Sequence, residues 1–72
     1  MRAIVDGRGV TVGDWVGFKC DIEQSGVITK ITKSITGVKE LHLRSNSEDG
    51  FEGEYIGGET TTVADARDCW LN

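Results

Sequence analysis

Two stretches decide the fold of this chain: VGDWVGFK at residues 12–19 and GVITKI at residues 26–31. Each stretch contains a glycine near its start that is suited to a turn. In each, a short alternating segment then follows, which has the two-residue period of a β-strand. In the first stretch Val16 and Phe18 share one face with Cys20, and these three are expected in the core. Trp15 falls on the opposite face and is expected to be partly exposed.

The rest of the chain repeats this pattern of short strands and glycine-bearing turns. Ten glycines and no proline occur in 72 residues, and helical periodicity extends over no more than one turn anywhere. We predict one all-β domain over residues 1–72, either a small SH3-like barrel or a strongly curved antiparallel sheet of five to six short strands. One short helical turn is expected near residues 64–68. The predicted strands span residues 2–5, 10–19, 26–35, 39–45, 51–57 and 60–63.

Finer features follow from the same alternation. Apolar residues lie on both faces of residues 27–32, which indicates a bulge or strong curvature there. Leu41 and Leu43 are expected to point inward, whereas His42 points outward. Trp70 and Leu71 are expected to return as a short closing strand or as a plug over one end of the barrel.

Length and composition limit what such a domain can do. A 72-residue chain with five aromatic residues buries a small core, so self-association into a homo-oligomer is a possible source of further stability. No apolar run approaches the roughly 20 residues of a membrane span. The first residues lack the apolar stretch of a secretory signal. We therefore expect a cytoplasmic protein that does not engage a membrane.

The two cysteines do not resemble a disulfide framework. Cys20 and Cys69 are far apart in the sequence, and a dense set of cysteines is absent. The leading interpretation is a pair of reduced, partly buried thiols. A disulfide or a reactive thiol remains the alternative.

No motif for catalysis or metal binding stands out. GEYIGGET at residues 53–60 has the spacing of a phosphate-binding loop, but Glu59 replaces the lysine that would meet the phosphates. His42, Cys20 and Cys69 lack the paired spacing of a zinc site. His42 alternates with leucines on a predicted strand, which is typical of a surface imidazole. We expect no enzymatic activity, no metal and no cofactor.

Charge divides the chain into two unlike halves. Residues 1–45 carry seven Lys/Arg against five Asp/Glu, whereas residues 46–72 carry one against seven, and the formal net charge is −4. A protein with this balance offers no broad basic surface for nucleic acid. The acidic stretch is either a solvated face or a contact for a basic partner. Together with the exposed aromatic side chain it defines our candidate partner-binding residues: Trp15, Glu48, Asp49, Glu52, Glu54 and Glu59.

The pattern V-G-D-x-V-x-F at residues 12–18, followed by G-x-I-x-x-I at residues 26–31, resembles small barrels of the KOW and Tudor type. Such barrels serve as interaction modules for proteins or nucleic acid. The second half, from Gly50 to Trp70, is similar to that of small uncharacterised bacteriophage-encoded proteins. This resemblance implies an accessory protein that binds a host component and blocks it. The chain departs from RNA-binding barrels in its acidic second half.

These observations favour a non-catalytic binding module, a phage-type accessory or inhibitor protein. It would bind and block a host macromolecular complex, for example a defence complex, through an acidic and aromatic surface. One alternative is a nucleic-acid-binding adaptor that uses the basic first half, namely Lys19, Lys30, Lys33, Lys39 and Arg44. Another is an oligomeric protein that sequesters a small nucleotide ligand.

Overall fold

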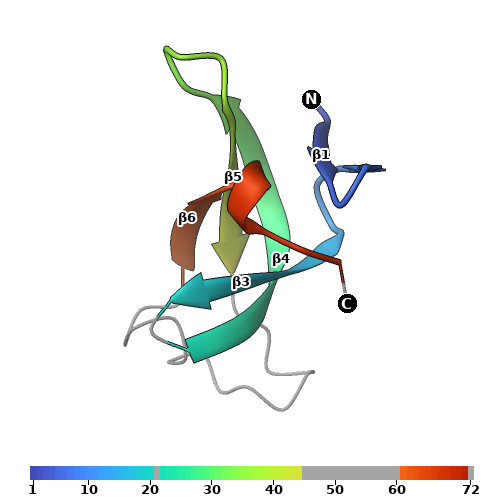
Figure 1. The fold of residues 1–72 in the computed structure, drawn as a ribbon, viewed down its shortest axis with the longest axis vertical. Helices are drawn as coiled ribbons and strands as arrows, with labels where there is room; N and C mark the ends of the chain where they lie inside the picture. The colour runs from blue at the N-terminus through green and yellow to red at the C-terminus, as the bar shows by residue number, and fades with distance from the viewer. Residues whose placement is uncertain (21, 45–60, 72) are drawn as a thin grey trace.

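A computed structural model describes residues 1–20, 22–44 and 61–71 of the chain. Within these ranges the fold is all-β, as predicted, with six strands and one short 3₁₀ turn (Figure 1). The elements are β1 (Ala3–Val5), β2 (Arg8–Val10), β3 (Trp15–Cys20), β4 (Ile22–Lys33), β5 (Lys39–Arg44), β6 (Thr61–Asp65) and η2 (Ala66–Asp68). The predicted strand over 51–57 lies outside the described residues. The described residues contain no helix long and apolar enough to span a bilayer.

The strands form two antiparallel sheets. β1 and β2 make a hairpin, and β3, β4, β5 and β6 form a four-stranded sheet in that order. Figure 1 shows β4 as a long, strongly curved strand that crosses β3 at one end and rises to the β4–β5 hairpin at the other. The pairing of β4 with β5 shifts register between Ile28 and Lys30, which is the irregularity expected where both faces carry apolar residues.

The strand predicted over residues 10–19 is wrong as one continuous element. Val10 ends β2, and a turn over residues 11–14 separates it from β3. The Asp14 amide donates to the Thr11 carbonyl at 3.1 Å, and the Asp14 carboxylate accepts from the Thr11 amide at 2.9 Å. Gly13 has a φ of 97°, which a glycine adopts at little cost at the third position of a type II turn. Local turn chemistry therefore breaks the alternating pattern.

The N-terminal hairpin turns through Asp6 and Gly7. Their φ angles are 51° and 75°, the left-handed values of a two-residue type I′ turn. Aspartate tolerates this conformation better than most residues because its short polar side chain bonds locally. The strand predicted to begin at residue 10 therefore begins two residues earlier, because Arg8 and Gly9 belong to β2.

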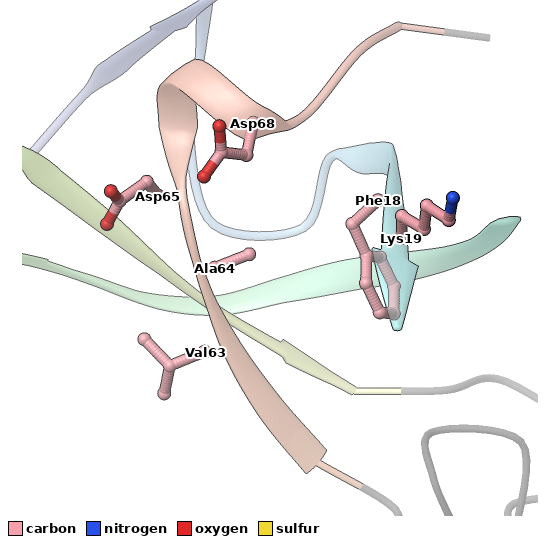
Figure 2. A pocket seen from close by; sticks show the side chains of 6 residues that line it. All are labelled: Phe18, Lys19, Val63, Ala64, Asp65 and Asp68. Carbon is pink, nitrogen blue, oxygen red and sulfur yellow. The ribbon is translucent and has the colours of Figure 1, made fainter. Parts of the chain in front are cut away.

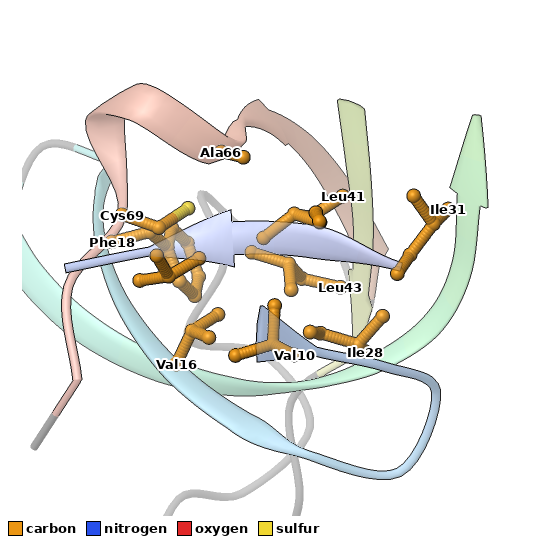
Figure 3. Packing of buried hydrophobic residues seen from close by; sticks show 11 residues of the cluster. Val10, Val16, Phe18, Ile28, Ile31, Leu41, Leu43, Ala66 and Cys69 are labelled. Atoms are coloured by element: carbon orange, nitrogen blue, oxygen red, sulfur yellow. The ribbon is translucent and has the colours of Figure 1, made fainter. Parts of the chain in front are cut away.

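The core lies on the concave side of the curved sheet and under the N-terminal hairpin. Val16, Phe18, Leu41 and Leu43 are at most 2% exposed, which confirms the inward faces predicted for β3 and β5. Figure 3 shows these side chains converging with those of Val10, Ile28 and Ile31. The side chain of Cys20, the third residue predicted for the β3 core face, lies outside the described part of the structure.

The end of the chain returns to the first strand of the four-stranded sheet. After β6, the chain makes the 3₁₀ turn η2 over Ala66–Asp68, as predicted for this region. Trp70 then pairs with Gly17 of β3, each amide donating to the other's carbonyl at 2.8 and 3.0 Å. The predicted closing segment is thus confirmed. Leu71, rather than Trp70, packs against the core.

Candidate binding surface

The outer face of β3 carries both tryptophans of the protein. Trp15, Gly17 and Lys19 alternate with the buried residues Val16 and Phe18, so they lie on the face away from the core. A side chain at Gly17 would overlap the Trp70 indole, so the indole occupies the space that such a side chain would fill. Because alternate residues of a strand are roughly 6.5 Å apart, the indole lies next to the position of Trp15. We call Trp15, Gly17 and Trp70 the tryptophan surface.

Both tryptophans are half-buried, and neither belongs to the hydrophobic core or packs against it. Trp15 was predicted to be partly exposed, and this is confirmed. Gly17 itself is buried under the indole. The glycine allows this approach because it has no Cβ to exclude the ring. The sequence signal was the glycine in the middle of an alternating strand, which often marks a site where another group comes close.

The tryptophan surface continues across the sheet. Val27 of β4 lies directly opposite Trp15, and Arg44 of β5 lies opposite Val27. Val27 is half-buried and Arg44 is exposed. The outer face beside Trp15 therefore offers an aromatic ring, an aliphatic side chain and a guanidinium in one row.

A pocket of about 470 Å³ lies beyond the tryptophan surface, between β3, β6 and η2 (Figure 2). This volume is in the range of ligand-binding pockets. Six residues line it: Phe18, Lys19, Val63, Ala64, Asp65 and Asp68. The lining therefore combines three apolar residues with three charged ones, and we call the charged part the rim.

Charge at the pocket rim is mainly negative. Asp65 and Asp68 approach from β6 and η2, whereas Lys19 extends away from both carboxylates (Figure 2). Arg67 contacts Asp65 at 3.3 Å, but this pair is well exposed, and such ion pairs contribute little. The Arg67 guanidinium partly neutralises the Asp65 carboxylate, so Asp68 supplies most of the remaining negative charge at the rim.

Cys69 follows η2 and is a buried, free thiol. Its Sγ donates to the Asp65 carbonyl at 3.4 Å. Burial, followed by the charges of Asp68 and Asp65, raises the pKa of this thiol to about 11. A thiol held in its protonated form is a poor nucleophile, so Cys69 has a packing role. The prediction of a reduced, buried cysteine is confirmed for Cys69.

His42 lies on the outer face of β5, opposite Lys30 of β4 and Val63 of β6. Its Nε2 is 2.9 Å from the Thr32 hydroxyl, a cross-strand hydrogen bond. Within residues 1–20, 22–44 and 61–71, no group of three or more His, Cys, Asp or Glu side chains is arranged to hold a metal ion.

The structure describes one of the residues that the sequence grouped as a binding surface. Of the six predicted partner-binding residues, Trp15 is described, whereas Glu48, Asp49, Glu52, Glu54 and Glu59 lie outside the described residues. Trp70, Asp65 and Asp68 join the candidate site, although sequence analysis did not select them. No local pattern identified these three, because the pairing of Trp70 with Gly17 brings them to β3.

The five basic residues proposed for nucleic-acid binding do not form one strip. By strand alternation, Lys30 lies on the outer face, opposite His42, whereas Lys33 and Lys39 face each other on the opposite side of the sheet. The Lys39 Nζ donates to the Arg2 carbonyl at 3.1 Å. The basic residues of the first half are therefore divided between two faces.

The chain matches no protein-family model, no curated protein and no solved structure.

Proposed function

We propose that this protein is a non-catalytic binding module that docks on another protein through the tryptophan surface. The observation that carries this proposal is the placement of both tryptophans outside the core of a very small domain. A large aromatic side chain stabilises a fold most when it is packed inside. Tryptophan is also, with tyrosine and arginine, enriched among the energetically dominant residues of protein interfaces.

The composition of the neighbouring surface supports the same proposal. Asp65 and Asp68 line a pocket that follows the tryptophan surface along β3. A basic groove on a partner would be complementary to these carboxylates, while the indoles supply the desolvated contact. The partner we propose is a component of a host macromolecular complex whose surface this module blocks. That part of the proposal rests on the resemblance to small phage-type proteins and on the resemblance to SH3-like barrels.

The test begins with capture of partners from nuclease-treated bacterial lysate by the tagged full chain. The recovered protein is then purified, and its affinity is measured by calorimetry for the parent and for Trp15→Ala. We expect this variant to weaken binding at least tenfold, because truncating a central aromatic residue of an interface commonly costs more than 1 kcal/mol. The same variant should unfold in urea close to the parent midpoint, since Trp15 does not pack against the core.

Val12→Ala provides the matched control. Val12 is an exposed apolar residue close to Trp15 in sequence, but it belongs to the turn before β3. Its truncation should leave the affinity within about twofold of the parent value. Equal affinity of the parent and Trp15→Ala, both folded, would contradict the proposal.

A further inference from the structure

The pocket between β3 and β6 is bounded on two sides by strand edges. Among the described residues, β3 and β6 are the two outer strands of the four-stranded sheet, each paired with one neighbour in that sheet. Phe18 and Lys19 come from one edge, and Val63, Ala64 and Asp65 come from the other. In Figure 2 the two strands lie on opposite sides of the opening. An opening of this kind has the geometry to accept an additional strand.

The hydrogen bonds of Gly17 show to which edge of β3 its amide and carbonyl groups point. The Gly17 amide and carbonyl bond to Trp70, on the side of β3 away from β4. In an antiparallel ladder this direction alternates, so the amide and carbonyl of Lys19, two residues further on, point the same way. Trp70 covers the β3 edge at Gly17, and the next backbone groups on that edge belong to Lys19, which lines the pocket.

The charge of the opening selects the kind of segment that would enter it. The Asp68 carboxylate lies between η2 and β6, and the Lys19 ammonium is directed away from it (Figure 2). The Asp65 carboxylate extends from the side of β6 that is turned away from Phe18. Val63 adds an aliphatic side chain that is 50% exposed. Lysine or arginine side chains on an incoming strand would pair with the carboxylates, whereas glutamate or aspartate would be repelled.

We propose that an extended segment of the partner protein, bearing lysine or arginine, adds to β3 at Lys19 as a further strand and fills this pocket. The segment continues the line that Trp70 begins at Gly17. Backbone hydrogen bonds to Lys19 provide affinity, and Asp65 and Asp68 select basic side chains. This inference rests on the proposed function as a protein-binding module and names the form in which the partner is recognised.

The experiment uses the full chain and defined peptide probes, followed by ¹⁵N–¹H NMR titration. The parent probe is a capped heptapeptide in which lysine alternates with valine. A second probe has glutamate in place of lysine. Two further probes carry backbone N-methyl groups on every second residue, one probe on the odd positions and the other on the even positions. Each probe thus lacks the amide donors on one edge of the strand.

We expect the parent probe to shift the amide signals of Lys19 and Val63 in a saturable manner. The glutamate probe and at least one N-methylated probe should bind at least tenfold more weakly. Asp65→Asn combined with Asp68→Asn should reduce the affinity for the lysine probe several-fold. Glu23→Gln, which removes an exposed carboxylate outside the pocket lining, should not.

Three results would overturn the inference: equal binding of the parent and both N-methylated probes, shifts confined to residues away from β3 and β6, or no saturable binding of the lysine probe. None of these depends on the tryptophan surface. If the probes fail while Trp15→Ala still weakens binding of the captured partner, strand addition is wrong and the proposed function stands. If Trp15→Ala has no effect while the probes bind as expected, the tryptophan surface is wrong instead.

Discussion

Gly17 is the residue on which the tryptophan surface depends. The Trp70 indole lies where a Cβ of residue 17 would be, so any larger residue must displace the ring. The backbone pairing of Gly17 with Trp70 holds the indole beside β3. One missing methyl group in the middle of a strand therefore determines where a tryptophan from the end of the chain is placed.

We predict that Gly17→Ala lowers the free energy of unfolding by about 1–3 kcal/mol, the usual cost of forcing an extra carbon into a packed site. In a Trp70→Ala background the same change should cost far less, because the indole is no longer there. Urea denaturation of the two single variants and the double variant gives the coupling energy directly. Additive effects within about 0.5 kcal/mol would show that the indole does not occupy this space in solution.

Cys69 gives the protein a pH dependence in the alkaline range. Its pKa is raised from 9.0 to about 11 by burial and by the charges of Asp68 and Asp65. The folded state therefore retains the thiol proton at a pH where the unfolded chain loses it. This contribution to stability is fully present below about pH 9 and is lost as the pH rises toward 11.

We predict that the parent loses more stability than Cys69→Ala between pH 8.5 and about 11, as measured by urea denaturation at each pH. The two proteins share every other ionisable group, so the comparison isolates the contribution of Cys69. The Cys69 thiol of the folded protein should also react slowly with iodoacetamide at pH 8. Parallel pH profiles for the two proteins would contradict the assignment.

At the scale of elements, the strands followed from the alternation of side chains. Val16 with Phe18 and Leu41 with Leu43 pointed to the core faces of β3 and β5, and both faces are buried. The bulge in β4 followed from apolar residues on both faces of one stretch. These features depend on neighbours two positions apart, so the sequence reveals them without knowledge of the partner strands.

Element boundaries were less predictable. β2 and β3 were merged into one strand because residues 10–19 alternate almost without interruption. The two hydrogen bonds between Thr11 and Asp14 form a turn within that run. β4 begins at Ile22, earlier than predicted, because pairing with β3 extends it through residues of mixed polarity. Tertiary pairing outweighs local pattern at such positions.

At the scale of the whole molecule, the two ends of the described chain are joined by one charge-assisted hydrogen bond. The Leu71 amide donates to the Asp6 carboxylate at 2.7 Å. Asp6 belongs to the turn of the N-terminal hairpin, and Leu71 packs against the core one residue after Trp70. The bond thus links the β1–β2 hairpin to the segment that closes the sheet.

We predict that Asp6→Ala lowers the free energy of unfolding by about 1–2 kcal/mol, and that Asp6→Asn costs less than about 1 kcal/mol. Asparagine keeps both the left-handed turn conformation and an acceptor oxygen, whereas alanine keeps neither. Asp14→Asn is the matched control, because the carboxylate of Asp14 bonds locally to Thr11. Urea denaturation measures the cost of each change.

Hydrogen exchange distinguishes the two aspartates. Asp6→Ala should accelerate exchange of the Trp70 and Gly17 amides, which pair with each other's carbonyls. Asp14→Asn should leave these two amides protected, since it affects only the turn before β3. Unchanged exchange at Trp70 in Asp6→Ala would show that the closing segment is held without this bond.

The sequence by itself determined the all-β class, the core-facing residues of β3 and β5, and the partial exposure of Trp15. These are consequences of side-chain alternation and turn chemistry, which act over a few residues. Only the tertiary structure decided that Trp70 lies on Gly17 and that Asp65 and Asp68 border a pocket with Lys19. Such contacts join residues far apart in the chain, and they form only when the curvature of the whole sheet brings β6 and the closing segment to the edge of β3.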